Sequence, residues 1–166
     1  EDLEMAVQTK LASMTLEQKV AQMFVITPEA LTGAGTVVQA GEQTKAALAA
    51  NPVGGLIYMA QNLTDPEQTK EMMACAMAFS KEITGLPMFL GIDEEGGTVT
   101  RVAQNPAFGV TDVGDMREIG VTGNVELAYQ AGQTIGAYLH ELGFNLDFAP
   151  VADVLTNDAN EVVYYR

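Results

Sequence analysis

Four short apolar runs alternate along the chain with longer segments of helical periodicity. The runs cover residues 23–26, 54–59, 88–92 and 144–148. The third run is apolar throughout, which is typical of a strand covered on both faces, as in parallel sheets. Short buried strands alternating with amphipathic helices predict an α/β fold with a parallel sheet.

Helix caps and apolar spacing predict the helices between these strands. Thr15 and Gln18 have the spacing of a capping box, and the run from Thr64 to Glu67 indicates a second one, with a helix that continues to Thr84. The apolar face of that helix is expected at Met72, Cys75, Phe79 and Ile83. Cys75 is interpreted as a small buried hydrophobe rather than a nucleophile.

The strongest helical pattern covers residues 124–142. Its apolar stripe consists of Ala128, Ala131, Ile135, Leu139 and Leu142. A short helix is expected at residues 46–50. Residues 27–41 and 93–123 are interpreted as connections, and residues 153–166 show no clear element.

The number of strands limits the architecture. Residues 1–166 contain no linker and are interpreted as a single incomplete domain. A closed (β/α)8 barrel needs eight strands and typically about 250 residues, and the sequence predicts four strands. The chain is therefore either an open α/β sheet or the first part, about four βα units, of a TIM-type barrel.

Composition excludes several classes of function. Eight Lys and Arg against 22 Asp and Glu give a net charge of −14, which disfavours nucleic acid and anionic membranes as partners. The single cysteine excludes an internal disulfide, and no apolar run approaches the roughly 20 residues of a membrane span. So little cysteine fits either side of a bacterial membrane, with an extracytoplasmic location slightly favoured.

Chemistry is expected at the carboxyl ends of the parallel strands. Asp93, Glu94 and Glu95 directly follow the third strand and precede two glycines. Three interpretations are open: a solvated acidic turn, a site for a hard cation such as Mg²⁺, and a polyol site in which carboxylates accept hydrogen bonds from sugar hydroxyls. Arg101 adds a donor for the third.

Four stretches in order resemble glycoside hydrolase family 3, nearest to its bacterial β-N-acetylglucosaminidase branch. The acidic stretch IDEEGGTVTR resembles the family signature D-[QE]-E-G-G-R-V-x-R. The others are MTLEQKVAQM near the start, NLDFAPVADV after the fourth strand, and NDANEVVYYR at the end. Thr98, Glu161 and Tyr164 depart from the family pattern.

The resemblance implies a retaining hydrolase that releases terminal β-linked GlcNAc from glycans or peptidoglycan fragments, with no cofactor and no metal. It implies that Asp93, Arg101 and Arg166 bind the sugar, and that Asp147 and Asp153 hold loops. The family's acid/base histidine and its nucleophilic aspartate belong to motifs that these 166 residues lack. The only histidine, His140, is interpreted as a surface residue or helix cap.

The chain is therefore expected to be the N-terminal portion of a family 3 barrel that is inactive alone. It is expected to self-associate or to be completed by another polypeptide that supplies the missing half. The alternatives are a family 3 β-glucosidase fragment, a non-catalytic acidic binding or interaction domain, and a metal-assisted enzyme that uses the three carboxylates.

Overall fold

The protein forms a four-stranded parallel sheet in a computed structural model that describes residues 2–157 and 159–164. The strands are β1 (Val25–Ile26), β2 (Gly55–Tyr58), β3 (Phe89–Ile92) and β4 (Leu146–Asp147), and they pair side by side in sequence order. This confirms the α/β class and the parallel sheet. Consecutive parallel neighbours are also the order that a (β/α)8 barrel requires.

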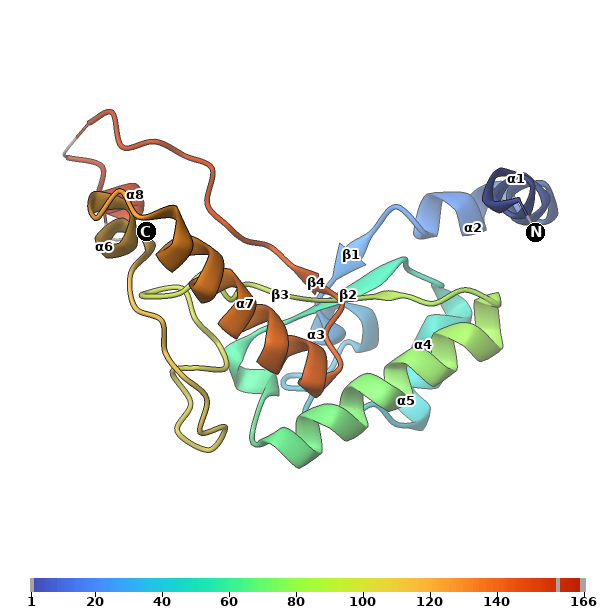
Figure 1. Ribbon diagram of the computed structural model, residues 1–166. Helices are drawn as coiled ribbons and strands as arrows, with labels where there is room; N and C mark the ends of the chain where they lie inside the picture. Colours follow the sequence, from blue (N-terminus) through green and yellow to red (C-terminus); the bar gives the residue numbers. More distant parts are fainter. Residues whose placement is uncertain (1, 158, 165–166) are drawn as a thin grey trace.

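The helices that connect the strands lie on one side of the sheet. In Figure 1, α3 (Pro28–Thr32), α4 (Glu42–Ala50) and α5 (Pro66–Thr84) lie below the strands. Helix α7 (Val125–Leu142) packs beside α5 and contributes Tyr138, Leu139 and Leu142 to the same core. In Figure 1, the helices labelled α1 and α2 lie towards one end of the strands and the helices labelled α6 and α8 towards the other, and no described helix lies over the middle of the opposite side, so the sheet has a covered face and an open face.

Several helices begin at a residue whose side chain caps the first turn. The capping box at Thr15 is present, because its hydroxyl accepts from the Gln18 amide and the Gln18 side chain accepts from the Thr15 amide. This box opens α2 (Leu16–Ala21). The second box is displaced by one residue, because Asp65 rather than Thr64 caps α5 through the Gln68 amide.

Three short helices lie where connections or no element were expected. They are α3, α6 (Met116–Val121) and α8 (Glu161–Tyr164). The start of α3 has a clear cause: the Thr27 hydroxyl accepts from the Ala30 amide, and Pro28 occupies the first turn. Gly33 ends this helix in the left-handed conformation, with φ of 72°.

The buried face of α5 is also rotated from the expected stripe. The fully buried side chains are Thr69, Met72, Met73, Ala76 and Ser80. Cys75 is half-buried, so the prediction of a buried cysteine is only partly right. The stripe was misplaced because Thr69 and Ser80 lie on the core side; the Ser80 hydroxyl donates to the Leu86 carbonyl.

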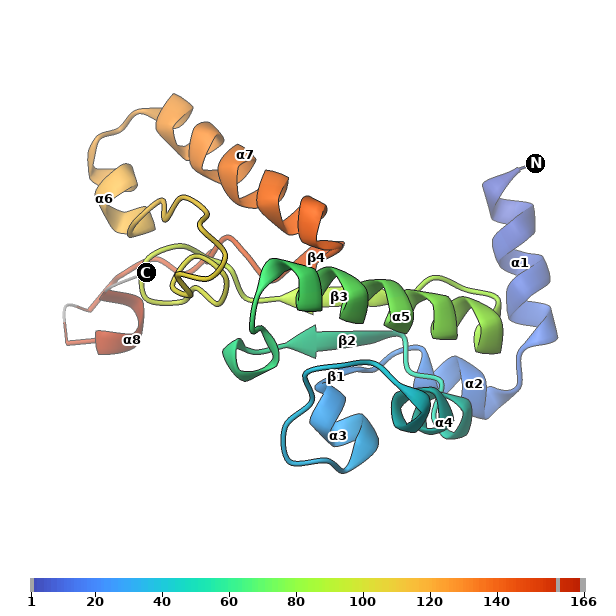
Figure 2. The same cartoon turned by 90° about the horizontal axis from the view of Figure 1, so that it is seen from below.

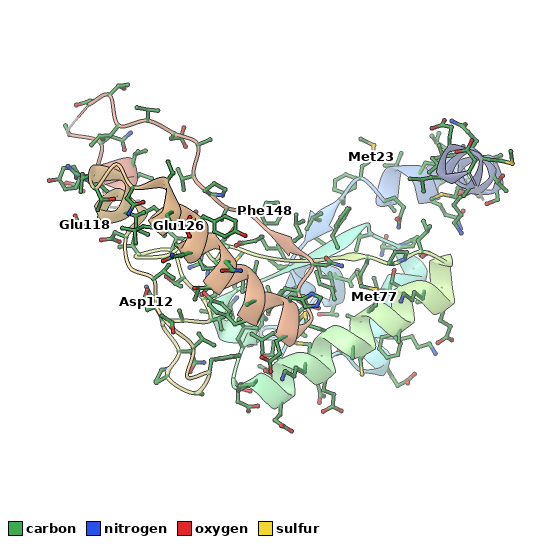
Figure 3. The ribbon with its side chains drawn as sticks, viewed as in Figure 1. Met23, Met77, Asp112, Glu118, Glu126 and Phe148 are labelled. Atoms are coloured by element: carbon green, nitrogen blue, oxygen red, sulfur yellow. The ribbon has the colours of Figure 1, made fainter. Side chains whose placement is uncertain are left out.

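The strands alternate between the two faces of the sheet. Leu56, Leu90 and Ile92 are at most 1% exposed and form the core with α5 and α7. On the open face Phe89 is 55% exposed and Phe148 is 45% exposed. Figure 3 shows Phe148 and Met23 on the side of the sheet away from α5.

The N-terminal helices extend beyond the sheet. Helix α1 (Leu3–Ser13) buries no residue, and Figure 2 shows it standing away from the strands at the far end of α5. The Lys10 ammonium donates to the Thr84 carbonyl and connects the two helices. None of the described helices combines the length and the apolar character needed to cross a membrane.

Candidate functional site

The consecutive acidic residues Asp93 and Glu94, at the carboxyl end of β3, lie on opposite faces of the sheet. Side chains of a strand alternate between faces, and Phe89 and Gly91 point to the open face. Continuing this alternation, Asp93 belongs to the open face and Glu94 to the covered face. Their burial agrees, because the Asp93 side chain is 25% exposed and Glu94 is fully buried.

Asp93 is paired with Arg101 across the loop. The Arg101 Nη2 atom lies 3.2 Å from Asp93 Oδ2, and the Arg101 side chain is 28% exposed. The Arg101 Nε atom is buried and has no hydrogen-bond partner among the described residues. The structure thus brings together two of the three predicted sugar-binding residues, with the pair partly open to solvent.

The Glu94 carboxylate is hydrogen-bonded to groups of the protein and is not accessible to a ligand. Its Oε2 atom accepts from the amides of Arg101 at 2.6 Å and Val102 at 2.9 Å. Its Oε1 atom accepts from the Ala103 amide at 2.9 Å and from the Tyr138 hydroxyl of α7 at 2.8 Å. Four donors satisfy the buried carboxylate, so Glu94 is committed to the protein itself.

The loop between these residues is a tight turn. The Glu95 amide donates to the Val99 carbonyl at 2.8 Å, and Gly96 forms a bridge with Val99. The Thr100 hydroxyl donates to the Gly97 carbonyl at 2.6 Å. Glu95 itself is only 6% exposed. The acidic–glycine stretch is therefore an ordered turn with two buried carboxylates, which contradicts the interpretation as a solvated acidic turn.

Asp147 connects β4 to this turn. Its Oδ1 atom accepts from the Glu94 amide at 3.0 Å. Burial raises the pKa of Asp147 to about 6, and the charges of Glu94, Asp93 and Glu95 act in the same direction. Burial likewise raises the pKa of the Tyr138 hydroxyl far above its ordinary value, so Tyr138 stays protonated and donates to Glu94.

The other predicted residues lie elsewhere. Arg166 is outside the described residues. Asp153 is exposed, and His140 is exposed in the last turn of α7, as expected. His140 lines a cavity between α7 and β4 together with Glu94 and Asp147, and neither Asp93 nor Arg101 belongs to that lining. No group of three His, Cys, Asp or Glu side chains among the described residues is arranged to hold a metal ion.

Sequence reasoning missed Tyr138. Its position one residue before Leu139 placed it beside the expected apolar stripe, and the available signal was a tyrosine at helical spacing from Ala131 and Ile135. Glu94, the partner of Tyr138, also borders the same mostly apolar cavity of about 520 Å³ between α7 and β4, whose lining includes Gly132, Gly136 and Asp147.

Four parallel strands in sequence order with helices between them, and Asp93 and Asp147 at the carboxyl ends of β3 and β4, define the class: the first half of a TIM-type barrel with a candidate site on its carboxyl-terminal rim. The chain belongs to glycosyl hydrolase family 3, because the model of that family's N-terminal domain matches residues 15–166.

The relatives agree with this assignment. The chain is 35% identical to β-hexosaminidase A of Pseudoalteromonas piscicida over 119 residues, which are 69% of this chain and 19% of that protein. It is 35% identical to β-hexosaminidase of Pseudomonas aeruginosa over 103 residues, covering 61% of this chain and 28% of that protein. The chain thus spans less than a third of the length of these relatives.

Two solved structures have the same fold. The family 3 β-N-acetylglucosaminidase of Paenibacillus sp. str. FPU-7 is 35% identical, with a TM-score of 0.78 over 91% of this chain and 27% of that chain. NagZ of Neisseria gonorrhoeae, solved in complex with N-trifluoroacetyl-D-glucosamine, is 26% identical, with a TM-score of 0.62 over 78% of this chain and 36% of that one. Both support the assignment to a partial barrel.

Proposed function

We propose that this chain is the N-terminal, sugar-recognising part of a retaining β-N-acetylhexosaminidase that hydrolyses terminal β-linked GlcNAc from glycans or peptidoglycan fragments. The observation that carries the proposal is the Asp93–Arg101 pair, which lies at the carboxyl end of β3 on the open face of a family 3 barrel. The hexosaminidase names of the relatives support the substrate class.

The pair suits sugar binding. An ionised carboxylate accepts hydrogen bonds from two neighbouring hydroxyls, and a guanidinium donates several in a fixed plane. The Arg101 side chain donates one hydrogen bond among the described residues, to Asp93, and its buried Nε donor has no partner there. A hydroxyl or acetamide oxygen of the sugar would supply an acceptor. Arg166, which lies outside the described residues, is proposed as a third contact.

Hydrolysis needs groups that these residues do not supply. Retention requires a nucleophilic carboxylate and a separate acid/base group beside the bond that is cleaved. Glu94 is enclosed by its four donors, and His140 lines the cavity between α7 and β4 rather than the Asp93–Arg101 pair. The 166-residue chain should therefore bind sugar without cleaving it.

The open face also suggests how the chain is completed. Phe89, Phe148 and Met23 expose apolar surface on the side where a closed barrel would have its interior. We propose that this face is covered either by self-association or by the missing half of the barrel.

Calorimetric titration with GlcNAc tests recognition. Asp93→Asn should weaken binding about 10- to 100-fold, because a charge-assisted hydrogen bond contributes about 1.5–3 kcal/mol. Glu71→Gln, which removes one negative charge from the exposed side of α5, is the control and should bind as the wild type does. Equal affinity for glucose would favour a β-glucosidase. No binding of either sugar, or no effect of Asp93→Asn, would contradict the proposed site.

An activity assay tests the second part of the proposal. The purified 166-residue chain should release no nitrophenol from 4-nitrophenyl N-acetyl-β-glucosaminide above the buffer rate. Measurable release that Glu71→Gln retains and Asp93→Asn loses would show that the chain catalyses hydrolysis by itself.

A further inference from the structure

The buried carboxylate of Glu94 occupies a distinctive place relative to the sugar-binding pair. It lies between Asp93 and the following turn, and on the opposite face of the sheet from Asp93. Its four hydrogen bonds reach forward seven to nine residues to Arg101, Val102 and Ala103, and across to Tyr138 of α7. The side chain therefore closes the turn and attaches it to the helical layer.

The backbone of Arg101 is held directly by this carboxylate. The 2.6 Å contact from the Arg101 amide to Glu94 Oε2 fixes where the side chain of Arg101 begins. Beyond the backbone, the only side-chain hydrogen bond recorded for Arg101 among the described residues is the one to Asp93 at 3.2 Å. The direction of the guanidinium thus depends on the anchored backbone more than on contacts of its own.

We propose that Glu94 is the positioning residue of the sugar site: by accepting hydrogen bonds from the amides of residues 101–103 it places Arg101 beside Asp93. The hydroxyl of Tyr138 on α7 orients the Glu94 carboxylate. This inference rests on the proposed function, because the pair it serves is the proposed sugar contact. Glu94 touches no substrate. It acts on affinity only through the geometry of Arg101.

If Glu94 only stabilised the fold, its substitution would have different effects on stability, local geometry and affinity. Any well-buried residue costs stability when it is changed, but a residue that only stabilises the fold leaves the local geometry and affinity unchanged in molecules that still fold. A positioning residue alters both at a temperature where the variant is fully folded. The two roles are therefore distinguished by affinity and spectra measured well below the unfolding temperature.

Glu94→Gln and Tyr138→Phe perturb the network to different extents. In Glu94→Gln an NH₂ group replaces one carboxylate oxygen. This NH₂ donor then faces other N–H donors, either that of Ala103 or those of Arg101 and Val102, and the hydrogen bonds at that position are lost. Tyr138→Phe removes one donor and leaves the three backbone contacts intact. Glu71→Gln makes the same chemical change on the surface of α5 and is the matched control.

The experiment uses ¹⁵N-labelled 166-residue chain and records the amide signals of residues 101–103 and the guanidinium signals of Arg101, followed by titration with GlcNAc. We expect Glu94→Gln to move these signals and to weaken GlcNAc binding tenfold or more while circular dichroism stays native. Tyr138→Phe should produce smaller shifts and about a threefold loss. Glu71→Gln should resemble the wild type.

The outcomes separate the two proposals. A folded Glu94→Gln variant with unchanged Arg101 signals and unchanged affinity overturns the positioning role. If that variant does not fold, Tyr138→Phe decides by the same two readouts, and no change in either overturns the role. If the wild type binds neither GlcNAc nor glucose, the sugar site is wrong, and the Arg101 signals of the unliganded variants still decide whether Glu94 sets its geometry.

Discussion

Asp147 allows a test in which the sign of a pH effect is fixed by the structure. Its carboxylate lies on the covered side of β4, where Oδ1 accepts from the Glu94 amide. Burial raises the pKa of Asp147 from an ordinary 3.8 to about 6. The folded state therefore holds this proton more tightly than the unfolded chain does. The stabilising contribution of Asp147 is complete below pH 3.8 and is lost as the pH rises through about 6.

Asp147→Asn removes this dependence while an amide oxygen remains to accept from the Glu94 amide. One pKa unit corresponds to about 1.4 kcal/mol, so the raised pKa corresponds to at most about 3 kcal/mol. Because Asp147 is only partly buried, solvent screening reduces this to about 1–2 kcal/mol. The variant should be more stable than the wild type by that amount at pH 8, with the advantage shrinking towards pH 5.

Urea unfolding followed by circular dichroism at pH 5, 6, 7 and 8 measures this difference. The range stays above the isoelectric point of about 4.2, where the chain carries little net charge. Asp153→Asn makes the same chemical change at an exposed position and should give no comparable trend. A stability difference for Asp147→Asn that is constant with pH, or that favours the wild type at pH 8, would refute the reasoning.

Three further predictions concern stability and association. Gly97→Ala should lower the free energy of urea unfolding by roughly 2 kcal/mol or more, because φ of Gly97 is 60° and the new Cβ would lie 1.9 Å from Asp115 Oδ1. The control is Gly132→Ala on α7, where the new Cβ meets nothing within 4 Å; it should raise the free energy of unfolding by up to about 1 kcal/mol. Equal effects of the two variants would contradict this geometry. Ile92→Ala should cost about 2–5 kcal/mol by the same measurement, because Ile92 is fully buried; a cost below 1 kcal/mol would place it outside the core. The 166-residue chain should self-associate in light scattering at micromolar concentration in 0.15 M salt, which screens its net charge of −14, and Phe89→Ser should reduce this; a monodisperse wild-type monomer would argue against an adhesive open face.

The helices and strands were predicted correctly from the sequence where capping residues and hydrophobic periodicity indicated the same element. Each of the four apolar runs contains a strand, and α7 (Val125–Leu142) lies within the predicted helical pattern over residues 124–142. Helix α3 was missed because Pro28 and the glycines at positions 33, 35 and 41 indicate a loop, whereas in the structure Thr27 caps the helix and Pro28 occupies its first turn. Helix α8 was missed because four residues are too few to show a period.

The site was readable only in part. The family signature singled out Asp93 and Arg101 as sugar-binding residues, and the structure shows that the two side chains form an ion pair. It could not separate the roles of Asp93 and Glu94, because that separation depends on which face of the sheet each side chain meets. The partner that identifies the role of Glu94, Tyr138, is 44 residues away in the chain, and only packing of α7 against the sheet brings them into contact.

The central claim is that the Asp93–Arg101 pair is where a saccharide binds. Mapping amide shifts of the ¹⁵N-labelled chain during a GlcNAc titration tests this most directly, because the map reports the location of the sugar as well as its binding. We expect saturable shifts concentrated in residues 93–101 and on the open side of β3 and β4. Shifts centred on the outer surface of α5, or no saturable shifts, would contradict it.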